Sequence, residues 1–368
     1  MPKSCFETIT SQHAYESHIQ SNPLVNPFSF SDLQTRASSW GRRQLLTCHV
    51  IVSSTRGTLL PAYETKQITH FPDKSRIQID NFIQGPGPDF IHQCEHSLVH
   101  EYGVALGQVW AALGAVKRPR ASVTDADDIK DAIPTSSSNQ GTPPSKRLRR
   151  NTHHEGFVNS DSYQINSSSP SSKLPGGTPD SSVGYVDKVL QEDLPVEDNA
   201  VRLISCIKRH ILYYIQLPGS TTVVEVRDIR QRMDLEIPGL SAGVIAVDDG
   251  GLYLKAKDEE GHFVITRSMV ALFEAKRSLN VVDGKPVISD ECLAQMTCEA
   301  ILARATDLFD EFPSTSVTII NATQKYVCFL QYDVEDSYIE DLKLGVAPSQ
   351  PLIVTATQWF DLSSSIEA

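Results

Sequence analysis

The sequence predicts an α/β protein in which a mixed β-sheet is flanked by helices, with a smaller α+β region near the N-terminus. Short apolar runs separated by turn residues recur between residues 222 and 274, and such runs are typical of strands. Amphipathic segments precede and follow them, at residues 197–216 and from about residue 290 to 308. Strands placed between helices in this order favour an α/β architecture.

Length and composition limit the class of protein. The chain has 368 residues, of which 40% are hydrophobic, enough for two modest domains or for one domain with a long appendage. Its net charge of −12 argues against a generally basic nucleic-acid coat, so any phosphate contact requires a local basic patch or a bound metal. Seven cysteines without a Cys-x-x-Cys pair indicate free thiols in a reducing compartment.

No stretch of the sequence approaches the ~20 apolar residues that a membrane-spanning helix needs. The first residues also lack the apolar core of a signal peptide. We therefore expect a soluble, intracellular protein that does not associate with membranes.

Composition also divides the chain into three segments. Residues 119–185 are rich in Ser, Thr, Pro, Asn and Gly and poor in branched and aromatic residues, which predicts a disordered linker. The linker separates an N-terminal α+β region of unknown role, residues 1–118, from residues 186–368.

The predicted linker contains one basic cluster, which follows two prolines and a serine. Its cations are Lys146, Arg147, Arg149 and Arg150. A flexible, exposed basic run is the kind of segment that an import receptor binds, so the cluster predicts a nuclear protein. The same cations could contact nucleic acid, and a solvated charge run is the third interpretation.

In the N-terminal region, the run from Leu45 to Val52 predicts a strand. Apolar residues recur at roughly helical intervals from Phe90 to Val116, which predicts one long or two short amphipathic helices. In the C-terminal part, acids in the first turn and bases nearer the end predict a helix over residues 197–216.

Five strand-like runs follow this helix, at residues 222–226, 243–247, 252–254, 263–265 and 270–274. The turn residues Asp248–Gly251 predict a hairpin connection between the second and third runs. Ser289 is placed to cap a helix that ends near Leu308, and residues 316–320 and 326–330 predict two closing strands.

A group of possible metal ligands lies in the N-terminal region, at His92, Cys94, His96 and His100. On a helix, His96 and His100 would stand one turn apart on one face, a spacing that can bind Zn²⁺. The neighbouring sequence does not supply the remaining ligands of a closed site, so histidines on a polar helix face are the favoured interpretation.

The most informative stretch is Met269–Arg277, an apolar run that ends in an acid and a base two residues apart. Alternate side chains of a strand share a face, so Glu274 and Lys276 point the same way. An unpaired buried charge is costly, and the two groups must therefore pair, reach solvent, or hold an ion and its substrate. Short patterns of this kind also recur as ordinary ion pairs.

The stretch Phe273–Arg277 at the end of a central strand, with the following helix that carries Gln295 and Glu299, resembles the fungal branch of the PD-(D/E)xK nuclease-like superfamily. The resemblance covers roughly residues 190–340. It implies a restriction-endonuclease-like core and Mg²⁺-dependent hydrolysis of DNA phosphodiesters. By this resemblance Glu274 is a metal ligand, Lys276 the catalytic lysine, and Gln295 a polar residue supplied by the helix near the cleft.

The chain departs from this family at the second metal-binding acid. Members of the branch commonly carry Pro-Asp before a Gly-Val strand, and the aligned position here is Ala242, which offers no oxygen. A metal site therefore needs a substitute carboxylate from Asp248, Asp249 or Asp234, of which the first two are nearest in the sequence. Without a substitute the site binds Mg²⁺ poorly, and the alternative is an inactive nuclease fold that serves as a binding or scaffold protein.

Overall fold

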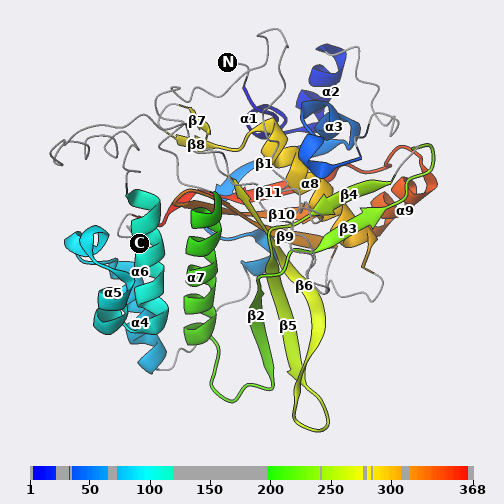
Figure 1. Ribbon diagram of the computed structural model, residues 1–368. Helices are drawn as coiled ribbons and strands as arrows, with labels where there is room; N and C mark the ends of the chain where they lie inside the picture. Colours follow the sequence, from blue (N-terminus) through cyan, green and yellow to red (C-terminus); the bar gives the residue numbers. More distant parts are fainter. Residues whose placement is uncertain are drawn as a thin grey trace, which may run out of the picture. The chain divides into compact units, whose positions relative to one another are not determined.

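The computed structural model describes residues 3–21, 33, 35–64, 73–118, 197–240, 243–276, 280–282, 285–307 and 315–363. The predicted linker, its basic cluster and Ala242 lie outside these residues. Within them the chain has an eight-stranded mixed sheet flanked by helices, which confirms the predicted α/β class (Figure 1). None of the described helices is both long and apolar enough to cross a membrane.

The strand order of the main sheet is β1-β11-β10-β9-β6-β5-β2, and β12 pairs with β10. Its strands are β1 (Val50–Gly57), β2 (Thr222–Arg227), β5 (Gly251–Lys257), β6 (Phe263–Lys276), β9 (Ser316–Thr323), β10 (Tyr326–Asp333), β11 (Leu352–Thr357) and β12 (Phe360–Asp361). Two pairs are parallel, β6 with β9 and β1 with β11, and the other pairs are antiparallel. Two small hairpins lie outside this sheet, β3 (Arg232–Leu235) with β4 (Val244–Val247), and β7 (Asn280–Val282) with β8 (Lys285–Val287).

The helices are α1 (Cys5–Thr8), α2 (Gln12–Ser21), α3 (Arg42–Thr47), α4 (Asp73–Gln84), α5 (Glu95–Tyr102), α6 (Val104–Lys117), α7 (Glu197–Ile215), α8 (Asp290–Ala305) and α9 (Asp336–Leu344). Short 3₁₀ turns occur at η2 (Ala37–Ser39), η3 (Pro61–Tyr63) and η4 (Pro88–His92). Figure 1 shows α6 and α7 side by side, and the two helices pack on each other through apolar residues such as Trp110 and Leu203.

Strand β6 separates the two helical layers because its side chains alternate between the faces of the sheet. Phe273 and Ala275 pack with Ile204 of α7 in one apolar cluster. Glu274, which lies between them in the sequence, instead contacts α8 through Gln295. Helices α7 and α8 therefore cover opposite faces of the sheet.

Helix α8 is buried on nearly every side, from Leu293 to Ala303. It packs against β6 and β9 on one side, and against η2, α3 and the β3–β4 hairpin on others. Ser289 caps the helix as predicted, accepting a hydrogen bond from the Cys292 amide. The carboxylate of Asp290 in its first turn accepts from the Cys5 amide at 2.6 Å and from Arg42 Nε at 2.6 Å. The N-terminal segment thus covers the helix that carries Gln295.

The N-terminal segment belongs to the same compact unit as the C-terminal half. Strand β1 extends the main sheet by pairing in parallel with β11, with Val50 opposite Leu352. The boundary that the sequence suggests near residue 118 therefore marks the start of the predicted linker and does not separate two cores. The sequence predicted one long or two short helices over Phe90–Val116, and the structure has two, α5 and α6. They are separated at Gly103, whose φ is 83°.

Three predicted elements differ in the structure. Residues Leu45–Thr47 belong to helix α3 and not to a strand, since a short buried apolar run fits either structure. The predicted strands 263–265 and 270–274 are one continuous strand, β6. The turn Asp248–Gly251 is not a hairpin connection, because β4 pairs with β3 whereas β5 pairs with β2 and β6.

Candidate metal-binding and catalytic site

The acid and the base at the end of β6 point to the same side, toward α8. The Glu274 side chain is fully buried, and its Oε1 accepts hydrogen bonds from Lys276 Nζ at 2.5 Å and from Gln295 Nε2 at 2.7 Å. Lys276 Nζ also donates to Gln295 Oε1 at 2.5 Å. The three side chains that the sequence singles out therefore form a closed triangle of hydrogen bonds.

A second buried carboxylate joins this triangle from the next turn of α8. Gln295 Nε2 donates to Glu299 Oε1 at 3.0 Å, so one carboxamide bridges two acids. Glu274 Oε2 and Glu299 Oε2 receive no donor from the other described side chains. Burial raises the pKa of both acids, and a hydrogen bond between the two carboxyl groups lowers the pKa of Glu274 and raises that of Glu299, so a proton on Glu299 links the two acids.

Asp249 enters the site from the residues just before β5. Its amide donates to the Phe273 carbonyl at 3.0 Å, and its Oδ2 accepts from the Ala275 amide at 3.1 Å, so it lies along the strand that holds Glu274. The two following glycines allow this approach. A Cβ at Gly250 would lie 2.6 Å from the Arg227 carbonyl oxygen, and one at Gly251 would lie 2.4 Å from the Ala271 carbonyl oxygen.

The neighbouring acid, Asp248, has a different environment. Its carboxylate accepts from Arg227 Nη1 at 3.1 Å and Nη2 at 2.5 Å, from the Gln231 amide at 2.9 Å and from the Gly250 amide at 3.1 Å. These donors occupy a fully buried carboxylate, so Asp248 anchors the turn. Asp234 lies on β3 with 67% of its side chain exposed. Of the three acids proposed to replace the one missing at Ala242, the structure brings Asp249 to the site.

The carboxylates of this site have altered acidities. Burial raises the pKa of Glu274 to about 7; Lys276 opposes this change and Asp249 adds to it. Burial also raises the pKa of Glu299 well above its ordinary value, and raises that of Asp249. Burial alone would lower the pKa of Lys276, but the adjacent Glu274 carboxylate raises it, so the lysine stays a cation. Burial thus favours the neutral forms of these three acids, and a bound cation would favour their ionised forms.

Two of these acids offer the ligand type that hard divalent cations prefer. Asp249 and Glu274 supply carboxylate oxygens, and Asp249 Oδ1 and Glu274 Oε2 are buried without a hydrogen bond to another described group. Mg²⁺, Mn²⁺ and Ca²⁺ prefer oxygen ligands. Among the described residues, however, these two acids and Glu299 do not form a group of three ligand atoms within 4.8 Å of one another. The thiol of Cys292 interacts electrostatically with Glu274 and Glu299.

Comparison with protein-family models gave no match, and comparison with curated proteins gave none either. Function must therefore be inferred from the order of the elements and the side chains that they bring together. That order is α7, β2, β5, β6, α8 and β9, with the β3–β4 hairpin inserted after β2. In it β2, β5 and β6 form an antiparallel meander, and β9 runs parallel to β6.

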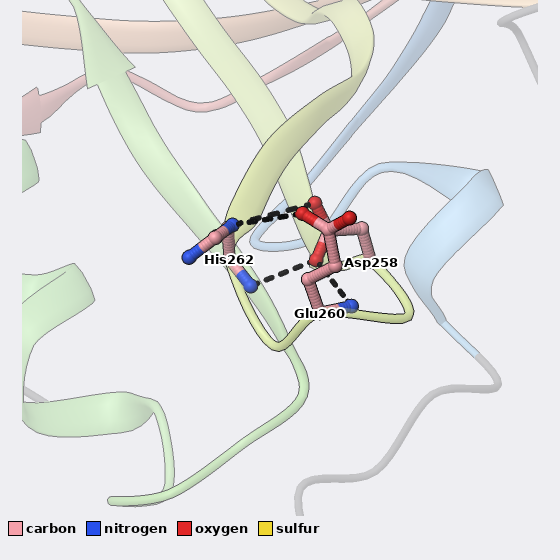
Figure 2. Close-up of side chains that lie close together, drawn as sticks. All are labelled: Asp258, Glu260 and His262. Carbon is pink, nitrogen blue, oxygen red and sulfur yellow. Dashed lines mark hydrogen bonds and ion pairs between the residues drawn. The ribbon is translucent and has the colours of Figure 1, made fainter.

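Sequence reasoning did not single out Arg230, whose Nη2 lies 3.1 Å from Asp249 Oδ1. The arginine lies in the loop between β2 and β3, and no local pattern connects it with an acid that follows nineteen residues later. It also did not single out a second group of ligand types, Asp258, Glu260 and His262, at the tip of the β5–β6 connection (Figure 2). The spacing of these ligand types at every second residue of an acidic turn could have indicated the group.

The ligand atoms of Asp258, Glu260 and His262 lie within 4.8 Å of one another, close enough to hold a metal ion. All three residues are exposed. Figure 2 shows that their hydrogen bonds also stabilise the turn, since Asp258 Oδ1 accepts from the amides of Glu260 at 3.0 Å and His262 at 2.8 Å. Formation of this exposed turn therefore explains why the three side chains lie together.

The histidines of the N-terminal region are brought together only in part. His96 Nε2 and His100 Nε2 lie 3.1 Å apart on α5, both exposed. His92 ends η4, and Cys94 precedes α5 and contacts Ser97 Oγ at 3.2 Å. Among the described residues, these side chains do not form a group of three ligand atoms within reach of one ion.

Proposed function

We propose that the protein is a metal-dependent nuclease of the PD-(D/E)xK type that hydrolyses phosphodiester bonds of DNA. One observation carries this proposal: Asp249, just before β5, lies along the end of β6, where Glu274 and Lys276 pair beside Gln295. The mixed sheet flanked by helices supports it, because the resemblance implies a restriction-endonuclease-like core of this class.

Each side chain has a role that follows from its environment. Asp249 and Glu274 would hold the divalent cation, which when bound polarises the phosphate and lowers the pKa of a water molecule. Lys276 stays protonated beside Glu274 and is placed to offset the negative charge that develops on the phosphate. Gln295 holds both partners, since its amide donates to Glu274 and its carbonyl accepts from Lys276.

A plasmid-cleavage assay on the full chain tests this function. We expect cleavage with Mg²⁺ or Mn²⁺, none with EDTA, and losses of at least about 100-fold in Asp249→Asn, Glu274→Gln and Lys276→Met. Asp234→Asn is the matched control, because it neutralises an exposed aspartate on β3. A wild-type chain without cleavage under either metal, or variants that cleave as well as the wild type, would contradict the proposal.

The second candidate function is an inactive nuclease fold that binds nucleic acid or another protein. One observation favours it: Lys276 donates to both of its neighbours and Arg230 contacts Asp249, so these groups largely satisfy one another without a ligand. This candidate predicts that the wild type and all three site variants fold normally and are equally inactive in the plasmid assay.

We also propose that the protein acts in the nucleus and enters it through an import receptor that binds Lys146, Arg147, Arg149 and Arg150. These residues lie outside the described part of the chain. The proposal is supported by the sequence of the cluster, in which four cations follow proline and serine within a segment poor in apolar residues. It also accords with DNA as the substrate.

A further inference from the structure

Arg230 stands at the exposed side of the candidate site. Its side chain is 37% exposed, whereas that of its partner Asp249 is 1% exposed. The Nη2–Oδ1 distance is 3.1 Å, yet Asp249 Oδ1 has no hydrogen bond of normal geometry in the described residues. The contact is therefore an ion pair without the alignment of a hydrogen bond.

A second arginine of the same segment shows what a fixed guanidinium looks like here. Arg227 is 11% exposed, and both of its terminal nitrogens donate to Asp248. It also donates to the carbonyls of Ile229 and Gly250, which ties the loop to the start of β5. Arg227 thus anchors the loop. Arg230, three residues later, contacts Asp249 but donates no hydrogen bond to a described residue, so its N–H groups can bind another acceptor.

We propose that Arg230 binds a phosphate group of the DNA backbone next to the Asp249–Glu274 site, exchanging its contact with Asp249 for the phosphate. This inference rests on the proposed nuclease function. A cation held by Asp249 would compete with the guanidinium for Oδ1, and the released guanidinium has the planar fork that matches phosphate oxygens. A chain with a net charge of −12 needs local cations to bind DNA, and among the described residues Arg230 and Lys276 form ion pairs with Asp249 and Glu274.

Arg232 provides a matched control. It lies two residues further along, in β3, with 63% of its side chain exposed and a distance of 3.9 Å to Asp234. Arg232→Ala removes the same charge from the same segment without touching Asp249 or Glu274. A difference between the two variants therefore reports on position and not on overall charge.

Binding of a short fluorescein-labelled DNA duplex, followed by anisotropy with Ca²⁺ in place of Mg²⁺ and at several salt concentrations, tests the proposal. We expect Arg230→Ala to weaken binding at least about tenfold and to reduce the slope of log K against log salt by about one. Arg230→Lys should fall between Arg230→Ala and the wild type, because an ammonium keeps the charge but not the fork. Arg232→Ala should bind nearly as the wild type does.

Calorimetric titration with Mn²⁺ in the absence of DNA supplies the second measurement. Arg230→Ala should bind Mn²⁺ at least as tightly as the wild type, since a competing cation has been removed from Asp249, and Asp249→Asn should bind it more weakly. Thermal unfolding of each variant checks that the fold is retained.

Each other outcome overturns the inference. If Arg230→Ala loses Mn²⁺ affinity, the arginine supports Asp249 and does not bind phosphate. If it binds DNA as the wild type does while the wild type cleaves plasmid, the nuclease proposal stands and the role of Arg230 is wrong. If the wild type neither binds nor cleaves DNA, both proposals fail.

Discussion

Lys208 is a buried cation on α7, and its removal should stabilise the protein. The residue is 7% exposed, and its Nζ lies 4.1 Å from the centroid of the Phe273 ring. No hydrogen bond or ion pair holds its ammonium in the described residues. Burial lowers the pKa of Lys208 from 10.5 to about 8.

The magnitude follows from this change in pKa. One pKa step corresponds to about 1.4 kcal/mol, so protonated Lys208 costs the folded state roughly 3 kcal/mol relative to an exposed lysine. The interaction with the Phe273 ring returns about 1–2 kcal/mol of this. Lys208→Met keeps the apolar stem and removes the charge, and we therefore expect it to raise the free energy of unfolding by about 1–2 kcal/mol at pH 7.

The same substitution should change the pH dependence of stability. Below pH 8 the folded and unfolded states of the wild type both carry the proton, so its disadvantage relative to Lys208→Met is constant. Between about pH 8 and 10.5 the unfolded state binds more protons than the folded state, and the stability of the wild type rises. The advantage of the variant should therefore shrink across this interval.

Urea unfolding of both proteins at pH 7, 8.5 and 10 measures this difference. Lys257→Met is the matched control, because Lys257 is exposed and its Nζ also lies over an aromatic ring, 5.3 Å from the centroid of Phe263. We expect the control to change stability by less than about 0.5 kcal/mol at every pH. A destabilised Lys208→Met, or a variant whose advantage does not depend on pH, would refute the reasoning.

Three further predictions concern the acids of the site region and the basic cluster. Asp248→Ala should lower the free energy of unfolding in urea by about 3–5 kcal/mol, because it leaves Arg227 buried without its partner. The control Asp234→Ala should lower it by less than about 0.5 kcal/mol. Equal losses would contradict the anchoring role of Asp248. The free energy of unfolding of Glu299→Gln should stay within about 1 kcal/mol of the wild type, since burial favours the neutral acid and the amide keeps an acceptor for Gln295. Glu299→Ala should lose more than about 2 kcal/mol of it. An equally large loss in Glu299→Gln would show that the carboxylate is charged. Alanine at the four cations of the basic cluster should move a fluorescent fusion of the full chain from the nucleus to the cytoplasm, and unchanged nuclear fluorescence would exclude the cluster as the import signal.

Much of the site could be predicted from sequence because its pattern is local. Two-residue spacing on a strand aligns Glu274 with Lys276, and helical spacing places Gln295 and Glu299 on one face. The sequence could not show whether Asp248 or Asp249 faces the site, because the side chains of adjacent residues point in different directions and only the fold decides which one points inward. In the structure Arg227 binds the Asp248 carboxylate, and Gly250 and Gly251 let the chain pass close to the carbonyls of Arg227 and Ala271.

The fold outside this core was harder to predict for a related reason. The parallel pairing of β1 with β11 joins residues that are about 300 positions apart, and nothing in either strand identifies the other. The apolar run at Leu45–Thr47 is compatible with either a helix or a strand, and in the structure it is buried as part of a helix. The class of fold follows from local periodicity, whereas the neighbours of each strand do not.

The cover that the N-terminal segment provides for α8 has a practical consequence for protein production. A fragment that starts at α7 would lack β1 and would uncover the edge of β11, while the apolar surface of α8 beneath α1, η2 and α3 would meet water. Bare strand edges and apolar patches of this kind promote aggregation. The C-terminal half is consequently not expected to fold alone, and an insoluble truncation would not test whether the intact protein cleaves DNA.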